Sequence, residues 1–575
     1  MTQTLESVVL PTGGAEWTKC PGCGCLVYHK RLNRNLRVCP ECEHHLRMGA
    51  RARIELLVDP GSFREADFEP LMPDPLEFSD SRPYRDRLAD ATAKSGESEA
   101  VLFGAALLGG RRAVLAVMEF SFMGGSMGLE VGRRMSEAAS LALRERAPLV
   151  VVCASGGARM QEGVFSLLQM ARTAVSFARL REAGVLSVSV LTDPTYGGVS
   201  ASFASLGSVV IAERGAHVGF AGPRVVQETI RAALPPGFQT AESQLLHGLV
   251  DRVENRADLR SLLIRLIDLH AGRSTCTAAD PVPEPAATRS TGSPAMRDSW
   301  AVVQAARSVD RPTTADYLRL VFDDFIELHG DRAYADDPAV VGGVASVAGR
   351  SVVVIGTQKG HTVKELVAHN FGMAHPEGYR KVMRLMEHAE LFGLPVVTFV
   401  DTPGAHPGPD AEERGQSIVI AETIMRSSRL RVPVVAVITG EGGSGGALAL
   451  CTSDRLLVLE NAFLSVISPE GCAAILWRSA SSAPAAASAL QLGAPQLLHS
   501  GIATSVVPEP TGGAQADPAA CAKTLREIII REIDELHEIS PADLLSGREQ
   551  RFSRLGGVAL TTPLTSEIAS CGGPI

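Results

Sequence analysis

The sequence lacks three features that would each place it in a special class of protein. It has no apolar run of transmembrane length, because stretches such as residues 434–438 are no longer than a buried strand. Its first residues show no basic segment followed by an apolar one, so we expect no secretory signal. It also has no basic excess: the net charge is −9, which argues against a dedicated nucleic-acid binder. We therefore expect a cytoplasmic chain without membrane contact.

The 11 cysteines do not resemble a disulfide framework, since most of them are scattered singly in apolar surroundings. The exception is a pair of C-x2-C motifs, fifteen residues apart, made by Cys20, Cys23, Cys39 and Cys42. Four thiolates on two tight turns suit a closed tetrahedral zinc site, which leaves no open position and is therefore structural. Cys25 does not fit this spacing. Unligated or disulfide-bonded cysteines are the alternative, which a cytoplasmic chain disfavours.

The 575 residues are too many for one hydrophobic core and suggest several domains. We expect a zinc ribbon at residues 16–48, two globular halves at 50–270 and 300–545, a Pro-rich flexible linker at 271–299 and a loosely ordered tail at 546–575. Short, almost continuously apolar runs alternate with helical periods in both halves. This pattern predicts α/β halves, each with a parallel sheet that is buried on both faces.

The two halves resemble each other. Residues 148–158 align with residues 395–405 at a separation of about 247 residues, and two later blocks repeat at nearly the same separation. Any two α/β domains share apolar strands followed by glycine, but three blocks at one separation indicate a tandem duplication.

Each half contains two glycine turns that follow an apolar strand and precede a helix. Glycine lets backbone N–H groups approach a ligand, and a helix N-terminus adds unpaired donors. Two adjacent turns can direct two N–H groups at one oxygen, forming an oxyanion hole. One glycine pair alone is more often a simple turn, but four turns at duplicated positions favour function. The candidate glycines are Gly156, Gly157, Gly197 and Gly198 in the first half and Gly404, Gly445 and Gly446 in the second.

Several motifs give the chain a specific resemblance from about residue 16 to residue 545, apart from the linker. The first half resembles the β subunit of bacterial acetyl-CoA carboxylase carboxyltransferase, and the second half resembles its α subunit. The motifs that carry the resemblance are residues 17–21, 122–128, 155–162 and 219–225 in the first half, and residues 329–332, 370–373, 376–381, 411–416 and 465–472 in the second.

The resemblance implies a duplicated crotonase-type (ClpP/crotonase) fold and a reaction. Such enzymes move CO2 from carboxybiotin, carried on a biotin carboxyl carrier protein, to the methyl carbon of acetyl-CoA, giving malonyl-CoA for fatty-acid synthesis. Biotin carboxylase is the further partner. The first-half turns would hold the thioester oxygen and the second-half turns the ureido oxygen of biotin. The family's two α and two β subunits correspond to a homodimer of this chain.

Some side chains near these turns remain ambiguous. Arg159 and Arg224 can pair with CoA phosphates or with protein carboxylates, and arginine suits both roles. Lys359 is a weaker candidate for facing biotin. The chain departs from the family pattern at Tyr196, His361 and His406, and also around His375. These departures leave the preferred acyl-CoA and the biotin contacts open.

Other functions compete with this one. Residues 124–128 and 442–446 both match G-x-S-x-G, so a serine hydrolase using Ser126 or Ser444 with His217 and Asp193 is an alternative. A zinc-ribbon protein that binds nucleic acid through basic residues near the N-terminus is another. A transferase that acts on propionyl-type thioesters, or a biotin-dependent decarboxylase subunit, would share the same scaffold.

Overall fold

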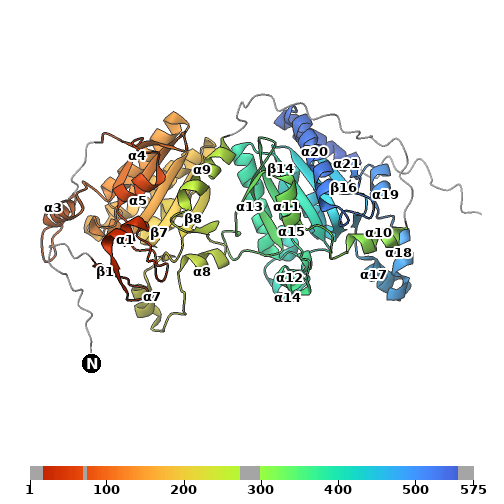
Figure 1. Ribbon diagram of the computed structural model, residues 1–575, viewed down its shortest axis with the longest axis horizontal. Coiled ribbons are helices and arrows are strands. Elements are labelled where there is room, and N and C mark those ends of the chain that lie inside the picture. The colour runs from red at the N-terminus through yellow and green to blue at the C-terminus, as the bar shows by residue number, and fades with distance from the viewer. Residues whose placement is uncertain (1–16, 69–73, 272–297, 555–575) are drawn as a thin grey trace, which may run out of the picture. The chain divides into compact units, whose positions relative to one another are not determined.

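The computed structural model describes residues 17–68, 74–271 and 298–554. The chain divides into two compact units, Met1–Leu246 with Val250–Ile267, and His247–Leu249 with Asp268–Ile575 (Figure 1). Most of the expected linker and tail lies outside the described residues, so their predicted character stays a prediction. In the described part of the chain, no helix combines the length and the apolarity needed to cross a membrane.

The first unit is built on an eight-stranded mixed sheet. Its order is β10-β8-β7-β6-β5-β4-β3, with β9 paired to β7. Strands β3 to β5 are antiparallel, and the pairs from β5 to β10 are parallel. The strands are β3 (Arg64–Glu65), β4 (Val101–Leu108), β5 (Arg111–Met118), β6 (Leu149–Ser155), β7 (Ser187–Tyr196), β8 (Val209–Glu213), β9 (Val218–Gly219) and β10 (Arg252–Glu254).

The second unit repeats this topology. Its order is β11-β12-β13-β14-β15-β16-β18, with β17 paired to β15, and again the first pairs are antiparallel and the rest parallel. The strands are β11 (Asp324–Glu327), β12 (Val340–Val347), β13 (Arg350–Thr357), β14 (Val396–Thr402), β15 (Val434–Gly443), β16 (Arg455–Leu459), β17 (Phe463–Ser465) and β18 (Ser505–Val507).

Helices cover the sheets in both units (Figure 1). In the first unit α4 packs on β4 and β5 and against α5, while in the second unit α13 packs on β12 and β13 and against α15. Every residue of β6 and β14 is buried, as parallel strands covered on both faces require. The main helices are α3 (Tyr84–Ser95), α4 (Leu129–Glu145), α5 (Val164–Glu182), α7 (Pro223–Ile230), α8 (Ala241–Leu246), α9 (Leu259–His270), α10 (Ser299–Ala306), α11 (Thr314–Val321), α12 (Val363–Ala368), α13 (Pro376–Phe392), α15 (Gln416–Ser428), α18 (Ala483–Leu490), α19 (Ala494–His499), α20 (Pro518–His537) and α21 (Pro541–Arg554).

The duplication extends to local irregularities. The register between β6 and β7 shifts between Cys153 and Ser155, and that between β14 and β15 shifts between Val400 and Thr402. A β-bulge re-aims the chain that follows it. In both units the chain leaving this bulge is a predicted glycine turn, so the same distortion positions both candidate sites.

A buried carboxylate at the end of a strand of the first sheet contacts the N-terminal module, which comprises residues 17–57. Strand β1 (Trp17–Lys19) pairs with β2 (Leu26–Tyr28), and α1 (His29–Arg34) and α2 (Ala50–Leu57) follow. Glu213, at the end of β8, accepts hydrogen bonds from Arg53 and Arg256, and all three side chains are buried. Arg256 also donates to the carbonyls of Leu36 and Leu46 in the module.

The charge of Glu213 is stable in this position. Burial alone raises the pKa of Glu213, but the charge of Arg53 and hydrogen bonds from Arg256 hold it well below its usual range. Removing one partner of such a buried cluster leaves uncompensated charge.

Glu213→Gln should therefore destabilise the N-terminal module, because two buried guanidinium groups lose their counter-charge. We expect a loss of about 3–5 kcal/mol, seen as an earlier thermal transition and as zinc release at a lower temperature. The control is Glu43→Gln, which breaks the exposed pair with Arg214 and should change nothing measurable. Identical melting of the two variants would show that Glu213 does not anchor the module.

Candidate active site and zinc site

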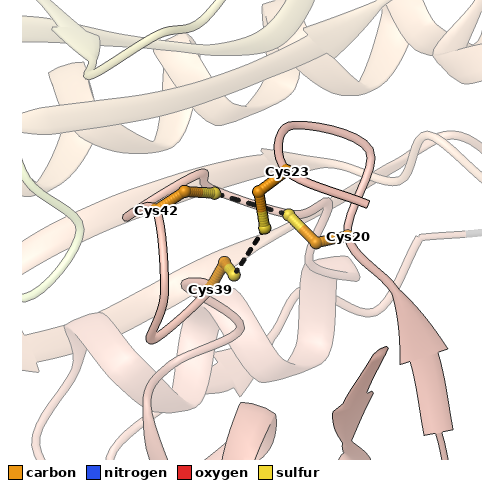
Figure 2. Close-up of side chains that lie close together, drawn as sticks. All are labelled: Cys20, Cys23, Cys39 and Cys42. Carbon is orange, nitrogen blue, oxygen red and sulfur yellow. Dashed lines mark hydrogen bonds between the residues drawn. The ribbon is translucent and has the colours of Figure 1, made fainter. Parts of the chain in front are cut away.

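The four cysteines of the two C-x2-C motifs converge, as Figure 2 shows. The Sγ atoms of Cys20 and Cys42 lie 3.6 Å apart, those of Cys23 and Cys39 lie 3.9 Å apart, and all four fall within 4.8 Å of one another. Four thiolates at Zn–S bonds of about 2.3 Å in a tetrahedron would lie about 3.8 Å from one another. The spacing of the cluster therefore suits a tetrahedral zinc ion, and Cys25 is not part of it.

The two glycine turns of the first half lie against each other. An added Cβ on Gly197 would lie 2.8 Å from the Cα of Gly157, closer than any real side chain approaches. Gly157 and Gly197 have φ angles of 125° and 60°, which favour glycine. The predicted turns thus meet backbone to backbone, and Gly197 cannot be replaced without moving Gly157. At Gly157 an added Cβ would lie an ordinary 3.5 Å from the Cα of Gly197, and only the positive φ favours glycine there.

Most of the predicted first-half N–H groups already have protein acceptors. Gly156 donates to the carbonyl of Gly124 (2.8 Å), Gly157 to Oγ of Ser155 (3.0 Å) and Gly197 to the carbonyl of Phe220 (2.9 Å). Within the residues that the structure describes, the N–H groups of Ala158 and Gly198 have no acceptor. These two are the donors that a ligand oxygen can use.

The second half repeats this pairing. An added Cβ on Gly446 would lie 2.5 Å from the nitrogen of Ala405 and 2.8 Å from the carbonyl carbon of Gly404. The N–H of Gly404 donates to Oγ1 of Thr402 at 3.1 Å. Gly445 and Gly446 lie in the first turn of α16 (Ser444–Cys451), where N–H groups lack intrahelical partners. Among the described residues, the N–H of Ala405 also lacks an acceptor.

The sequence therefore predicted the turns but not all of the donors. Gly156, Gly157, Gly197 and Gly404 shape the turns, and their N–H groups are occupied. The residues that sequence reasoning missed are Ala158 and Ala405. Ala158 directly follows Gly157, and Ala405 directly follows Gly404. The available sequence signal was therefore the position immediately after the glycine turn that follows each of these strands.

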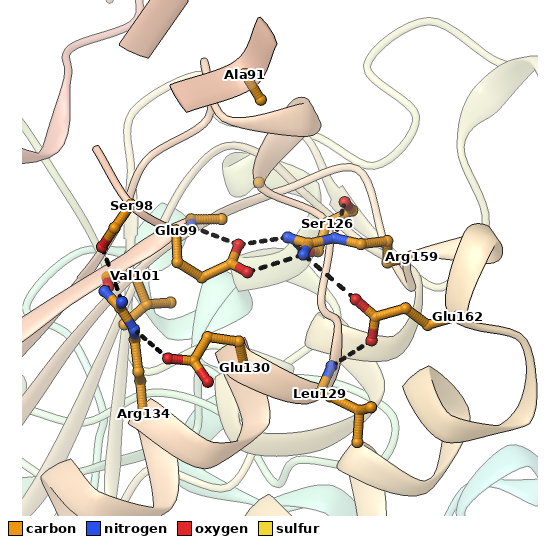
Figure 3. Close-up of polar contacts among 12 residues, drawn as sticks. Ala91, Ser98, Glu99, Val101, Ser126, Leu129, Glu130, Arg134, Arg159 and Glu162 are labelled. Atoms are coloured by element: carbon orange, nitrogen blue, oxygen red, sulfur yellow. Dashed lines mark hydrogen bonds and ion pairs between the residues drawn. The ribbon is translucent and has the colours of Figure 1, made fainter. Parts of the chain in front are cut away.

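Arg159 forms buried ion pairs, which is one of the two alternatives that the sequence left open. Its side chain is 0% exposed, and its guanidinium contacts both oxygens of Glu99 at 2.5 and 2.9 Å (Figure 3). It also donates to the carbonyl of Ser126. Glu162 accepts from the N–H of Leu129 at the start of α4. Burial opposes the charge of Arg159, but Glu99 raises its pKa above the ordinary value.

Arg224 and Lys359 are the other two cationic side chains that the sequence predicts near the site. Arg224 lies in α7, but its side chain falls outside the described part of the structure. The Nζ of Lys359 lies 2.8 Å from Oδ1 of Asp401 and 2.8 Å from Oε1 of Glu441. Burial lowers the pKa of Lys359, but the two carboxylates raise it above the ordinary value, so the ammonium stays charged.

A cavity of about 240 Å³ lies beside the second-half turn. Pro403 of that turn, Phe371 and Lys359 line it, together with Asp401 and Glu441. The residue of the first half that is equivalent to Asp401 is Ala154, since both lie at the register shift of their strand, and Ala154 is buried and apolar. The second half therefore has a charged cavity floor at a position where the first half has a methyl group.

His375 and His406, two of the residues at which the chain departs from the family pattern, lie next to each other. The rings of His375 and His406 lie 4.2 Å apart, and the Nε2 of each is 3.8 Å from a carboxylate oxygen of Asp410. These three side chains are close enough to suggest a metal site. However, Nδ2 of Asn370 donates to Nδ1 of His406 and to the carbonyl of Met373, so Nε2 carries the hydrogen of the neutral ring. In this tautomer the Nε2 of His406 is a hydrogen-bond donor and not a metal ligand.

The other two departures have separate surroundings. Tyr196 ends β7 beside Gly197, and burial raises the pKa of its hydroxyl to about 12. His361 has an acceptor at each ring nitrogen, the carbonyl of Val309 at 2.7 Å and Oδ2 of Asp316 at 2.8 Å.

The hydrolase alternative lacks its central contact. Nδ1 of His217 does pair with Asp193 at 2.9 Å. The hydroxyl of Ser126, however, accepts from Arg159, and in the described residues no hydrogen bond joins Ser126 or Ser444 to His217. A nucleophilic serine needs that bond to its base.

Known proteins resemble this chain along nearly its whole length. A family model described as acetyl co-enzyme A carboxylase carboxyltransferase-like matches residues 293–556, and one described as the acetyl-CoA carboxylase zinc finger domain matches residues 17–42. A Saccharopolyspora erythraea protein named acetyl-coenzyme A carboxylase carboxyl transferase subunits beta/alpha is 54% identical over 546 residues, 94% of each chain. The alpha subunit of Thermus thermophilus is 58% identical over 260 residues, covering 45% of this chain and 83% of its own.

The fold has a solved counterpart. The structure of transcarboxylase 12S, determined with methylmalonyl-coenzyme A and methylmalonic acid bound, superposes with a TM-score of 0.69 at 20% identity, covering 89% of this chain and 92% of that one. Its likeness establishes the fold of the two units.

Together, the duplicated sheets with paired glycine turns and the four-cysteine ribbon form a crotonase-type fold with a structural zinc site. The relatives make the chain a carboxyltransferase. At 54% identity over 94% of its length, the chain belongs to the family of acetyl-CoA carboxylase carboxyl transferase subunits beta/alpha.

The zinc site predicts metal content directly. We expect about one zinc per chain in freshly purified protein, none in Cys39→Ala, and about one in the matched variant Cys25→Ala, because Cys25 lies outside the cluster. Atomic absorption on desalted protein measures this. Zinc-free wild type, or loss of zinc from Cys25→Ala, would contradict the assignment of the ligands.

His361 should make the second unit more stable at low pH. The hydrogen bond to Val309, with Asp316, raises the folded pKa of His361 above 6.5. Because the folded pKa is the higher one, the stabilisation is complete below the unfolded pKa and is lost as the pH rises through the folded pKa. Thermal melts should therefore show a decline toward alkaline pH that is smaller in His361→Gln. The same decline in His361→Gln as in wild type would contradict this role of His361.

Proposed function

We propose that this enzyme transfers a carboxyl group from carboxybiotin, carried on a biotin carboxyl carrier protein, to acetyl-CoA, and that malonyl-CoA for fatty-acid synthesis is the product. The single observation that supports this most is the duplicated pair of unpaired N–H groups, Ala158 with Gly198 and Ala405 with Gly446. Two holes suit a reaction in which two different oxygens gain negative charge.

The first-half donors are assigned to the thioester oxygen of acetyl-CoA. Removing a proton from the methyl carbon places negative charge on that oxygen, and the N–H groups of Ala158 and Gly198 stabilise it without moving. Arg159 holds the turn in place through Glu99 and Ser126, as a positioning residue. Arg224 remains the candidate for the phosphates of CoA.

The second-half donors, Ala405 with Gly446, are assigned to the ureido oxygen of biotin. As the N–C bond of carboxybiotin breaks, CO2 leaves and charge moves to that oxygen. The ureido nitrogen takes the methyl proton, and the enolate carbon forms the new C–C bond to CO2. No side-chain nucleophile is required.

The remaining assignments follow the family. The ribbon at residues 16–48 precedes the carboxyltransferase domains at 50–270 and 300–545, and its zinc is structural because all four ligand positions are filled. We propose that the chain works with biotin carboxylase, and that a homodimer supplies the equivalent of two α and two β subunits.

Gly446→Val should abolish malonyl-CoA formation while the protein stays folded. The new side chain would push the Ala405 N–H out of position, since its Cβ would lie 2.5 Å from that nitrogen. Loss of one oxyanion donor costs on the order of a hundredfold or more in kcat. Gly198→Val should act similarly through the first-half turn, although its nearest neighbour there is the flexible end of Met127.

The matched control is Gly547→Val in α21, where no atom lies within 4 Å of the added Cβ. Malonyl-CoA formation is measured with carboxylated carrier protein and acetyl-CoA. Wild-type rates in Gly446→Val and Gly198→Val would remove the two glycine turns from the mechanism.

A further inference from the structure

The N–H of Ala158 points away from the neighbouring chain because both residues that flank it bond to Met127. The N–H of Met127 donates to the carbonyl of Gly157 at 2.8 Å, and the N–H of Arg159 donates to the carbonyl of Met127 at 2.9 Å. Met127 and Ala158 thus form an isolated parallel bridge. In such a bridge the residue between the two bonds directs its own N–H to the opposite side. The segment that contains Met127 therefore sets the direction of the Ala158 N–H.

The carboxylate of Glu162 holds the end of that segment. Its Oε2 accepts from the N–H of Leu129 at 2.5 Å, at the start of α4 (Figure 3). An added Cβ on Gly128 would lie 2.8 Å from the carboxyl carbon of Glu162, so the carboxylate packs directly on this backbone. A negative charge is favoured at the N-terminus of a helix. The position of Met127 therefore depends on how the Glu162 carboxylate is oriented.

The hydroxyl of Tyr84 fixes the other oxygen of Glu162. Tyr84, on α3, is fully buried, and its hydroxyl donates to Oε1 of Glu162 at 2.7 Å. Arg159 is a weaker partner, since the distance from its Nη1 to the same oxygen is 3.5 Å. Its guanidinium also binds Glu99 and the carbonyl of Ser126. Burial, together with the charge of Glu162, raises the pKa of Tyr84 above its ordinary value, so the hydroxyl keeps its hydrogen.

The equivalent positions of the second half, all within the described residues, do not repeat this contact. At the separation of about 247 residues between the halves, Leu129 corresponds to Pro376, the first residue of α13, and Glu162 corresponds to Pro409. Proline has no N–H, so the first residue of α13 offers no donor to a carboxylate. The contact of Tyr84 with Glu162 is therefore a feature of the first half alone.

We propose that Tyr84 and Glu162 are positioning residues of the first-half oxyanion hole. The Tyr84 hydroxyl orients the Glu162 carboxylate, the carboxylate holds the start of α4, and the segment at Met127 then directs the N–H of Ala158. Both side chains are buried and act through the backbone. This inference rests on the proposed function, and it extends the residues on which that function depends to α3, a helix that precedes both glycine turns in the chain.

A misdirected donor weakens the transition state more than it weakens substrate binding. The thioester oxygen gains its negative charge only as the methyl proton leaves, so the Ala158 N–H exerts most of its effect at that point. Loss of the Tyr84 hydroxyl should therefore lower kcat and leave the KM for acetyl-CoA nearly unchanged. A purely structural role of Tyr84 would instead lower the fraction of folded protein.

Tyr84→Phe removes the hydroxyl and keeps the ring. In malonyl-CoA formation from carboxylated carrier protein and acetyl-CoA, we expect kcat to fall roughly three- to thirtyfold. The KM for acetyl-CoA should stay within about twofold of the wild-type value. The matched control is Tyr317→Phe, at another fully buried tyrosine, whose hydroxyl lies 3.9 Å from Sγ of Cys521 and which should keep the wild-type kcat. All rates are measured well below the melting transition of each variant.

Glu162→Gln tests whether the two residues act together. The amide keeps one oxygen that accepts hydrogen bonds but loses the charge of the carboxylate. If Tyr84 acts through Glu162, then Tyr84→Phe should lower kcat much less in the Glu162→Gln background than in the wild-type chain. Equal fold losses in the two backgrounds would show that Tyr84 acts independently of Glu162, which overturns the inference.

The outcomes separate this inference from the proposed function. If the wild-type protein forms no malonyl-CoA, the proposed function fails and this inference fails with it. If the wild type is active but Tyr84→Phe has the same kcat as Tyr317→Phe, only the inference is overturned. A higher KM without a lower kcat also overturns it. Where Glu162→Gln does not fold, the kcat of Tyr84→Phe decides.

Discussion

Contact between two backbones, without side chains in between, is the constraint on which both candidate sites depend. In each half the chain leaving a bulged strand packs against the turn of the neighbouring strand so closely that a Cβ on Gly197 or Gly446 would overlap backbone atoms. This proximity brings N–H groups from two strands to one place. Parallel pairing of those strands fixes the distance, and the bulge re-aims the chain so that it no longer continues the ladder.

Much of this arrangement was predictable from the sequence because duplication and glycine placement are local signals. The strands, the turns after them and the four zinc ligands follow from spacing and periodicity. The identity of the donors does not, because it depends on which N–H groups the fold has already used. Gly157 donates to a serine hydroxyl two residues earlier, while Ala158, which carries no sequence signal of its own, is left unpaired.

Arg159 shows the same limit for side chains. An arginine beside a glycine turn suits a phosphate, and only the fold shows that Glu99, sixty residues earlier in the chain, already neutralises it. The equivalent second-half position is His406, which is partly exposed and bonded to Asn370. Duplicated positions therefore keep their backbone hydrogen bonds while their side chains differ. The N–H of Arg159 donates to the carbonyl of Met127, and the N–H of His406 donates to the carbonyl of Ala374.

Under the proposed function, that separation lets one scaffold serve two substrates. The backbone donors are generic, because any oxygen that gains negative charge is stabilised by them. Selectivity must then come from side chains that the backbone geometry does not constrain, and the bulge residue is the best placed of these. Ala154 leaves the first-half turn with backbone amides alone, whereas Asp401 contacts the Lys359 ammonium and the N–H of Glu441, and all three residues line a cavity beside the second-half turn. The difference between Ala154 and Asp401 at the equivalent register shift, together with the Lys359 ammonium that balances Asp401, makes the two copies chemically different.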